Sequence, residues 1–319
     1  MKIVLTDAQT VTNGDLDLSV FEKYGEVVIY PLTSHEETAA RIADADVVLL
    51  NKTVMDAEVL SQAKNLKYIG IFATGFNMID LDYCRAHGIT VSNAGSYSTE
   101  AVAQTVFAFL LHHYSRVADY DAFVREGGWK NSASFSPFVF PTFELAGKTI
   151  GIFGFGAIGR KVAQIAQAFS MKVIAVPHRM PETVDPEDPV AYTDLDTMLG
   201  AADIVSVHTP LNEETRGLFD ADMFAKMKPG AYFVNTSRGG VLDEQALRDA
   251  LESGHLSGAG IDVLTQEPMR ADCVLHGAKN LTTTPHVAWA PHETRVRLLD
   301  IVETNLQNFI AGTPTHVVS

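Results

Sequence analysis

Short apolar runs alternate with helical patterns along almost all of the 319-residue chain. In the first part of the chain, helices are predicted at 34–45 and 56–65, with Ser34 and Asp56 as their N-caps. The apolar runs around these helices predict strands at 2–7, 26–30, 46–51, 67–73 and 89–93. Because strands and helices alternate, the sequence predicts an α/β fold in which helices connect the strands of parallel sheets.

A second alternating series follows a long helical segment that is predicted at about 98–126. Between them lies segment 131–147, which is rich in Phe, Pro and Ser and predicts an irregular, packed connection. The strands of the second series are predicted at 148–154, 171–176, 203–210, 231–237, 258–264 and 281–286. Its helices are predicted at 157–169, 195–201, 219–226, 243–253 and 291–311.

The composition indicates a soluble globular protein and argues against several kinds of partner. Hydrophobic residues make up 46% of the chain and charged residues 20%, and no apolar stretch approaches the roughly 18 residues of a membrane helix. The net charge of −15 disfavours nucleic acids and acidic membrane surfaces, because both are polyanions. Cys84 and Cys273 form no disulfide framework, so a cytoplasmic location is expected. No spacing of His and Cys indicates a metal site.

A glycine-rich motif, GFGAIG, follows the first strand of the second series and opens a helix. In this setting Gly154 allows a tight turn, Gly156 lets the backbone approach a pyrophosphate, and Gly159 lets the helix pack closely on the strand. The helix start also offers unpaired N–H groups and a positive dipole end to phosphates. The motif therefore predicts a dinucleotide site, and a glycine turn without a ligand is the alternative.

The residues after the next strand bear on which dinucleotide is bound. An Asp or Glu that bonds the ribose 2′-OH is expected about 20 residues beyond the motif, but Pro177 stands there, followed by His178 and Arg179. The missing carboxylate removes repulsion of a 2′-phosphate, and an arginine supplies charge-assisted hydrogen bonds to it. We therefore expect NADP(H) to be preferred, with NAD(H) also accepted. The alternative is that Arg179 is a solvated loop residue and NADH binds without the ribose acid.

Polar residues stand at the ends of the last three predicted strands, where sites in such sheets are found. They are Arg238, Asp262 with Glu267, and His286 with Trp289. An arginine could pair with the carboxylate of a 2-keto acid, and a protonated histidine could donate a proton to its keto oxygen. An adjacent glutamate would hold the imidazole and favour its charged form. Taken singly, each residue could equally be structural, and His292 is a local rival, although 291–293 predicts a helix start.

Five motifs in order make the chain resemble the D-isomer-specific 2-hydroxyacid dehydrogenase family over essentially its whole length. They are GFGAIG (154–159), VHTPLNEETRGLF (207–219), VNTSRGGVLDEQAL (234–247), GIDVLTQEP (260–268) and TPHVAW (284–289). The resemblance implies an NAD(P)-dependent oxidoreductase that acts on the CH–OH group of a D-2-hydroxy acid. It also implies a catalytic triad of Arg238, Glu267 and His286.

The same resemblance implies which residues surround the cofactor. The contacts that it adds are Ala157 and Ile158 at the pyrophosphate, Thr209, Pro210 and Thr215 at the adenine, and Val102, Thr236, Ser237 and Asp262 at the nicotinamide. Core packing alone would also explain Val102.

The resemblance also implies two parallel-sheet domains, Rossmann-like or flavodoxin-like, with the active-site cleft between them. Residues 1–98 plus 288–319 would form the substrate (catalytic) domain, and residues 99–287 the dinucleotide-binding Rossmann domain. The implied substrate contacts, besides Arg238, are Asn51, Thr74, Gly75, Phe76 and Trp289. A plain glycine turn at Gly75 and a packed core position for Trp289 are the alternatives.

Within the family, the chain most resembles the glycerate dehydrogenases, also called hydroxypyruvate reductases. NKT (51–53), ATGFN (73–77) and YSTEAVAQ (97–104) carry this likeness. Reduction of hydroxypyruvate or glyoxylate to D-glycerate or glycolate is therefore expected, by a homodimer whose interface is formed by the long helix and residues 120–145. The alternatives are a reductase of another 2-keto acid, such as a phosphoglycerate dehydrogenase, and a non-catalytic dinucleotide sensor that acts as a co-repressor.

Overall fold

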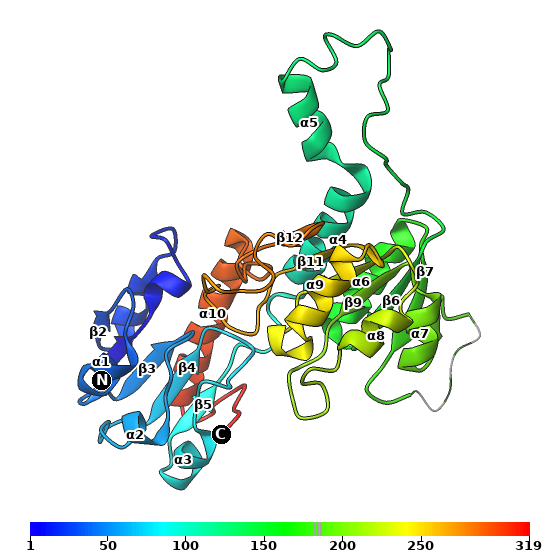
Figure 1. Cartoon of the computed structure of the whole chain (residues 1–319). Helices are drawn as coiled ribbons and strands as arrows, with labels where there is room; N and C mark the ends of the chain where they lie inside the picture. The colour runs from blue at the N-terminus through cyan, green and yellow to red at the C-terminus, as the bar shows by residue number, and fades with distance from the viewer. Residues whose placement is uncertain (181–182, 184, 186) are drawn as a thin grey trace. The chain divides into compact units, whose positions relative to one another are not determined.

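The computed structural model describes residues 1–180, 183, 185 and 187–319 (Figure 1). The chain forms two compact units, each built around its own parallel sheet. The amino-terminal unit contains Met1–Ser98 and Ala290–Ser319, and the central unit contains Thr99–Trp289. The predicted fold class, two α/β units with parallel sheets, is confirmed.

The amino-terminal unit has a five-stranded sheet in the order β2-β1-β3-β4-β5. The strands are β1 (Lys2–Leu5), β2 (Glu26–Ile29), β3 (Val47–Leu50), β4 (Tyr68–Ile71) and β5 (Thr90–Ser92), and all neighbours are parallel. The helices are η1 (Ala8–Thr10), η2 (Leu18–Tyr24), α1 (His35–Ile42), α2 (Ala57–Leu60), α3 (Leu81–Ala86) and α10 (His292–Ile310). Ser34 and Asp56 cap α1 and α2 through their side chains, as predicted. Helix α10 packs on β4, where Phe309 stacks on Tyr68.

The central unit has a seven-stranded parallel sheet in the order β12-β11-β10-β9-β6-β7-β8. The strands are β6 (Thr149–Phe153), β7 (Lys172–Val176), β8 (Val190–Tyr192), β9 (Ile204–Val207), β10 (Ala231–Asn235), β11 (Leu256–Ile261) and β12 (Leu281–Thr283). The helices are α4 (Thr99–Ser115), α5 (Val117–Arg125), α6 (Ala157–Ala168), α7 (Leu195–Ala201), α8 (Ala221–Lys226), η3 (Gly239–Val241) and α9 (Glu244–Glu252). The chain runs outward from β6 to β8 and returns to β9 on the other side, so the strand order reverses between β6 and β9, where such sheets bind ligands.

Hydrophobic layers cover both faces of this sheet. Alternate residues of β6 point to opposite faces, so Ile150 and Ile152 join the core beneath α4 and α6. Gly151 faces the other side, where a Cβ atom would lie 2.6 Å from Cγ of Met198 on α7. The absence of a side chain at Gly151 therefore lets α7 approach the sheet closely.

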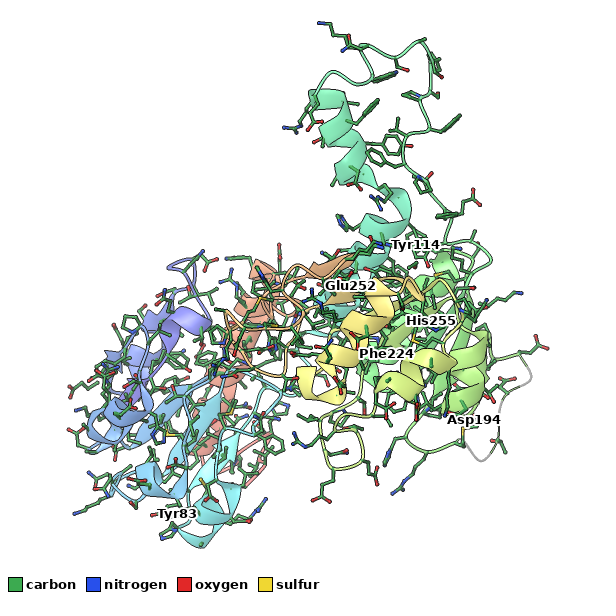
Figure 2. All side chains as sticks on the ribbon, in the orientation of Figure 1. Tyr83, Tyr114, Asp194, Phe224, Glu252 and His255 are labelled. Carbon is green, nitrogen blue, oxygen red and sulfur yellow. The ribbon has the colours of Figure 1, made fainter. Side chains whose placement is uncertain are left out.

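Helices α4 and α5 replace the continuous helical segment that was predicted at about 98–126. The chain breaks at Arg116, whose φ of 52° is left-handed, and α5 buries none of its residues. Figure 1 shows α5 and the segment after it extending away from the sheet of the central unit. Segment 131–147 is irregular, as predicted, but much of it is not packed: Phe135 and Phe138 are 90% and 91% exposed, whereas Leu145 is buried in the core. The reason is that α5 carries this segment away from the core, and Figure 2 shows the side chains of the segment standing clear of the sheet.

The sequence did not predict α3, β8 or the three short 3-10 helices. These elements have three to seven residues each, which is too short for a periodic pattern to stand out. Among the described residues, no helix combines the length and the apolar character needed to cross a membrane.

Candidate active site

The GFGAIG motif forms the turn between β6 and α6, as the sequence predicted. Gly154 has a φ of 93°, and a Cβ atom there would lie 2.5 Å from the carbonyl oxygen of His208, at the end of β9. A Cβ atom at Gly159 would collide with the carbonyl oxygen of Gly154. A Cβ atom at Gly156, in contrast, would meet no atom within 4 Å. Two of the glycines thus allow tight packing, and the third leaves open space beside the backbone.

The start of α6 differs from the starts of the other helices on this sheet. Helices α7, α8 and α9 are capped by the carboxylates of Asp194, Asp220 and Asp243, each of which accepts a backbone N–H group. The N-cap of α6 is Gly156, with no side chain to accept, and the first turn contains no acidic residue. The N–H groups at Ala157 and Ile158 therefore have no capping carboxylate. This arrangement fits a phosphate group.

The loop that bears on cofactor choice lies beside the glycine turn. The N–H group of Gly154 donates to the carbonyl oxygen of Val176, the last residue of β7, at 3.1 Å. Pro177 follows and is half-buried, and the side chains of His178 and Arg179 are exposed. Among residues 177–180 there is no carboxylate, so two cationic or neutral side chains stand where an acid is usual.

Glu267 and His286 form the pair that the sequence predicted. One carboxylate oxygen of Glu267 lies 2.7 Å from Nδ1 of His286. The other oxygen accepts the backbone N–H of Leu264 at 2.9 Å, which fixes the orientation of the carboxylate. The pairing orients the imidazole and favours a proton on Nδ1, because a carboxylate can only accept. Nε2 is then the ring nitrogen that is left to face a substrate.

Asp262 holds the turn that carries His286. Its carboxylate is 2% exposed and accepts the hydroxyl of Thr284 at 2.5 Å and the N–H groups of Val287 and Ala288, both at 2.9 Å. Burial raises the pKa of Asp262, and these hydrogen bonds act in the opposite direction. His286 itself adopts a left-handed φ of 55° between these anchors. Asp262, which was predicted to meet the nicotinamide, thus organises the loop that carries His286.

The Arg238 turn lies against the loop that carries Glu267. Arg238 follows the end of β10, is half-buried, and donates from its guanidinium to the carbonyl oxygen of Ser237 at 2.7 Å. A Cβ atom at Gly239 would collide with the backbone carbonyl of Leu264, so the two loops touch directly. Arg238, Glu267 and His286 therefore stand on neighbouring loops at the carboxyl edge of β10, β11 and β12.

The other predicted cofactor residues have different local roles. The hydroxyl of Thr236 is buried and has no hydrogen-bond partner within the described part of the chain, so it can serve a bound ligand. Ser237 donates its hydroxyl to Asn235. Thr215 is buried and closes its own loop by donating to the carbonyl oxygen of Pro210 at 2.7 Å. Thr209 is half-buried in the same loop, and Val102 is a core residue of α4.

The predicted substrate residues of the amino-terminal unit lie at the ends of β3 and β4. Asn51 is 2% exposed, and its amide donates to Thr10, so this side chain holds the unit together. The hydroxyl of Thr74 donates to the carbonyl oxygen of Gly95. Gly75 is half-buried and Phe76 is 39% exposed.

Asp7 was missed by the sequence reasoning, although it anchors the loop that contains Asn51. It is buried, and its carboxylate accepts the N–H groups of Asn51, Lys52 and Thr53 at 2.5–2.9 Å. Its place at the end of the first predicted strand was the signal that the sequence offered.

Trp289 and His292 lie close together in the sequence but belong to different units. Trp289 is the last residue of the central unit and is half-buried. His292, the rival of His286, begins α10, as the predicted helix start implied, and its imidazole lies 3.4 Å from the carbonyl oxygen of Asp15. In the described part of the chain, no group of three or more His, Cys, Asp or Glu side chains could hold a metal ion.

These features define a class of protein. A doubly wound sheet, an open glycine turn at its switch point, an uncapped helix start and an unpartnered Thr236 hydroxyl together fit a nicotinamide dinucleotide. The model of the NAD binding domain of the D-isomer specific 2-hydroxyacid dehydrogenases matches residues 107–288. The chain belongs to this family of oxidoreductases.

Relatives and solved structures agree with this assignment. The chain is 41% identical to a hydroxypyruvate reductase of Blautia hydrogenotrophica, with all of both chains covered. It is 36% identical to a glycerate dehydrogenase of Methylorubrum extorquens, covering 99% of this chain and 98% of that one. An acyclic imino acid reductase in complex with NADPH and D-Arg superposes with a TM-score of 0.85 at 31% identity, with both chains fully covered.

Proposed function

We propose that the protein reduces hydroxypyruvate or glyoxylate to D-glycerate or glycolate by hydride transfer. The observation that carries the proposal is the contact between Glu267 and His286 at 2.7 Å, with the Arg238 turn packed against the same loop. The printed names of the relatives, hydroxypyruvate reductase and glycerate dehydrogenase, support this substrate class. The dinucleotide, when bound, supplies the hydride.

The three side chains of the proposed triad bind the substrate and transfer the proton. The Arg238 guanidinium pairs with the substrate carboxylate in a two-pronged contact and polarises the adjacent ketone. His286, charged and held by Glu267, donates the proton from Nε2 to the keto oxygen as it gains negative charge. The Glu267 carboxylate stabilises the imidazolium and keeps the ring in one orientation. The proton lost by His286 returns from solvent after the hydroxy acid leaves.

Initial rates with different 2-keto acids test the substrate class. Hydroxypyruvate and glyoxylate should give a higher kcat/KM than pyruvate or phosphohydroxypyruvate, measured with each reduced dinucleotide. A preference for phosphohydroxypyruvate would instead make the protein a phosphoglycerate dehydrogenase. Dinucleotide binding without turnover of any 2-keto acid would favour a sensor and would refute the proposal.

Substitutions of the triad test the proposed roles. His286→Ala should lower kcat by about 10²–10⁴-fold, the usual share of general acid–base catalysis. Arg238→Ala should raise the KM of the keto acid and lower kcat, because the guanidinium serves both binding and the transition state. Near-wild-type rates in either variant would overturn the role given to that residue.

We further propose that NADP(H) is preferred over NAD(H). The support is the exposed Arg179, with His178 beside it, close to the glycine turn and without a carboxylate at residues 177–180. An arginine recognises a 2′-phosphate through charge-assisted bonds.

Comparison of the two dinucleotides tests this preference. Arg179→Ala should raise the KM of NADPH by about tenfold, the value of one such bond, and leave that of NADH nearly unchanged. Arg85→Ala, an exposed arginine of the amino-terminal unit, is the matched control. A tenfold or greater preference of the wild-type protein for NADH would refute the proposal.

On the substrate side, we propose that backbone N–H groups at Gly75 and Phe76, next to Thr74, receive the substrate carboxylate. Asn51 keeps the neighbouring loop in place through Thr10. Trp289 would restrict the site to small acids by occupying space. Trp289→Ala should therefore raise kcat/KM for longer 2-keto acids relative to glyoxylate, and an unchanged ratio would contradict this role.

We propose that two copies of the chain associate through the arm formed by residues 117–143. The arm exposes apolar side chains that no layer of its own unit covers, among them Val117, Trp129, Phe135 and Phe138. An open pocket of about 370 Å³ lies among Tyr120, Phe123 and these aromatic residues. Such an exposed apolar surface is typical of a protein–protein interface.

Light scattering after size exclusion tests the association. The wild-type protein should be a dimer, and the double substitution Phe135→Ser with Phe138→Ser should shift it to a monomer. Leu32→Ser, at an exposed apolar residue of the amino-terminal unit, should leave the dimer intact. A monomeric wild-type protein would refute the proposal.

A further inference from the structure

Asn235 is a fully buried amide at the carboxyl end of β10. It is 0% exposed and lies between Val207 of β9 and Ile261 of β11 in the sheet register. Its backbone carbonyl accepts the N–H group of Asp262 at 3.0 Å, as part of the sheet. The backbone of Asn235 thus makes the hydrogen bonds of the sheet, and its side-chain amide can bond other groups.

Within the described part of the chain, the hydrogen bonds of this side chain go to the turn that carries Arg238. The amide oxygen accepts the N–H group of Ser237 at 3.0 Å and the Ser237 hydroxyl at 2.8 Å. The amide nitrogen donates to the carbonyl oxygen of Arg238 at 2.9 Å. The first contact is an Asx-turn, in which an asparagine side chain takes the place of a backbone carbonyl.

The position of the guanidinium depends on the peptide groups that Asn235 holds. Arg238 donates from its side chain to the carbonyl oxygen of Ser237 at 2.7 Å. That carbonyl belongs to the peptide between Ser237 and Arg238, and Asn235 bonds the N–H group on one side of it and the carbonyl on the other. Rotation of this peptide would therefore move the guanidinium.

The turn has little room to settle elsewhere. Gly239 packs against the backbone carbonyl of Leu264, and the N–H group of Leu264 bonds Glu267. A shift of the turn toward that side would therefore disturb the Glu267 loop. A shift away would leave the buried amide of Asn235 without partners, which is unfavourable because a desolvated polar group then lacks its hydrogen bonds.

We propose that Asn235 is a positioning residue that holds Arg238 in place for the 2-keto acid. This inference rests on the proposed role of Arg238 in binding the substrate carboxylate. Asn235 touches neither substrate nor cofactor in this proposal. It acts by holding the groups on either side of the Ser237–Arg238 peptide, whose carbonyl oxygen accepts from the guanidinium.

Two substitutions of Asn235 separate its two kinds of contact. Asn235→Ala removes all three hydrogen bonds. Asn235→Asp keeps the acceptor for Ser237 and replaces the donor to Arg238 with an oxygen, so it removes the contact that fixes the Arg238 carbonyl. Asn305→Ala is the matched control, because Asn305 is also buried at 1% exposure and bonds Asn93 and Thr315 in the amino-terminal unit.

The readouts distinguish positioning from a purely structural role. Both Asn235 variants should raise the KM of hydroxypyruvate and the inhibition constant of oxamate, a non-reducible carboxylate analogue, by about tenfold or more. The Kd of the reduced dinucleotide, measured by fluorescence, should change by less than about threefold because the glycine turn is untouched. Asn305→Ala should lower thermal stability without changing either constant.

Either of two results with a folded Asn235 variant would overturn the inference. Unchanged KM and oxamate inhibition in a folded Asn235 variant would refute it, and so would a parallel loss of dinucleotide binding and keto acid binding. If neither variant folds, Asn235→Ser decides, because a serine hydroxyl can still accept the N–H group of Ser237, while the amide donor to the Arg238 carbonyl is lost. A severalfold rise in the KM of hydroxypyruvate with an unchanged dinucleotide Kd then supports the inference, and an unchanged KM refutes it.

Arg238→Lys separates this inference from the proposed function. Full activity of Arg238→Lys would refute the proposed role of the guanidinium itself. A strong loss in Arg238→Lys together with wild-type behaviour of the Asn235 variants would refute only the positioning role.

Discussion

Replacing Glu267 with glutamine measures what the carboxylate beside His286 contributes to catalysis. The two oxygens of Glu267 accept from two different groups, the N–H of Leu264 at 2.9 Å and Nδ1 of His286 at 2.7 Å. Glutamine has the same shape but only one carbonyl oxygen, so its NH₂ group must face one of these two donors. The variant therefore either leaves the Leu264 N–H unsatisfied or places a donor against the imidazole.

The expected loss follows from the strength of one charge-assisted bond. A hydrogen bond to a charged group contributes about 1.5–3 kcal/mol. The side chains of His286 and Glu267 are 23% and 34% exposed, so solvent screening places this bond near the lower end, at about 1.5–2 kcal/mol. Because 1.36 kcal/mol corresponds to a factor of ten, kcat should fall by about 10–30-fold. The KM of the keto acid should change by less than about threefold, since Glu267 is not proposed to touch the substrate.

The assay follows the absorbance of the reduced nicotinamide at saturating hydroxypyruvate. Glu252→Gln is the matched control, because the Glu252 carboxylate also accepts a backbone N–H, that of Lys279. Glu252, which is labelled in Figure 2, is the last residue of α9, and the other end of this helix, at Glu244, contacts Thr265 in the Glu267 loop. A kcat within twofold of the wild-type value in Glu267→Gln would refute the reasoning. An equal loss in Glu252→Gln would show that the effect is one of general stability.

Two further predictions concern stability. Gly159→Ala should lower the free energy of unfolding by about 1–3 kcal/mol, the cost of overpacking, because the added Cβ collides with the Gly154 carbonyl. Gly156→Ala has open space around the added Cβ, so it should lower the free energy of unfolding by less than about 1 kcal/mol and yet bind dinucleotide more weakly. Chemical denaturation combined with dinucleotide titration checks both, and equal stability losses in the two variants would contradict the packing argument. Burial lowers the pKa of His208 to about 3 and that of His113 to about 4, so between pH 6.5 and 4 the unfolded chain binds protons that the folded chain does not. The free energy of unfolding should therefore fall as the pH falls through this range, by at most about 1.4 kcal/mol per pH unit for each histidine, and His208→Gln should make the slope shallower; an unchanged slope would contradict the assignment.

The architecture could be predicted because its signals are repeated along the chain. Most strands of the two sheets are short apolar runs, and most crossover helices carry their own periodic pattern, with β8 and α3 as exceptions. The break at Arg116 could not be predicted, since arginine carries no signal for a left-handed backbone. The exposure of Phe135 and Phe138 was also missed, because composition indicates aromatic packing without showing which surface the aromatic residues contact.

The pairing of Glu267 with His286 could be anticipated because parallel neighbouring strands place their carboxyl ends at one edge. The contacts that hold the turns of Arg238 and His286 could not be anticipated. Asp262 and Asn235 act through N–H groups and carbonyls of particular turns, and these contacts depend on backbone conformation and not on residue type. Thr284 is a further example, since its bond to Asp262 depends on the register of β11 and β12, which places Thr284 beside the end of β11.

The left-handed backbone at His286 limits which replacements give a well-folded but catalytically silent enzyme. Its φ of 55° lies in a region that asparagine and aspartate visit readily and that β-branched residues avoid. Asparagine is therefore the replacement of choice for trapping a keto acid and a reduced cofactor together in crystals. Valine at the same position would distort the loop, and its inactivity would say nothing about proton donation.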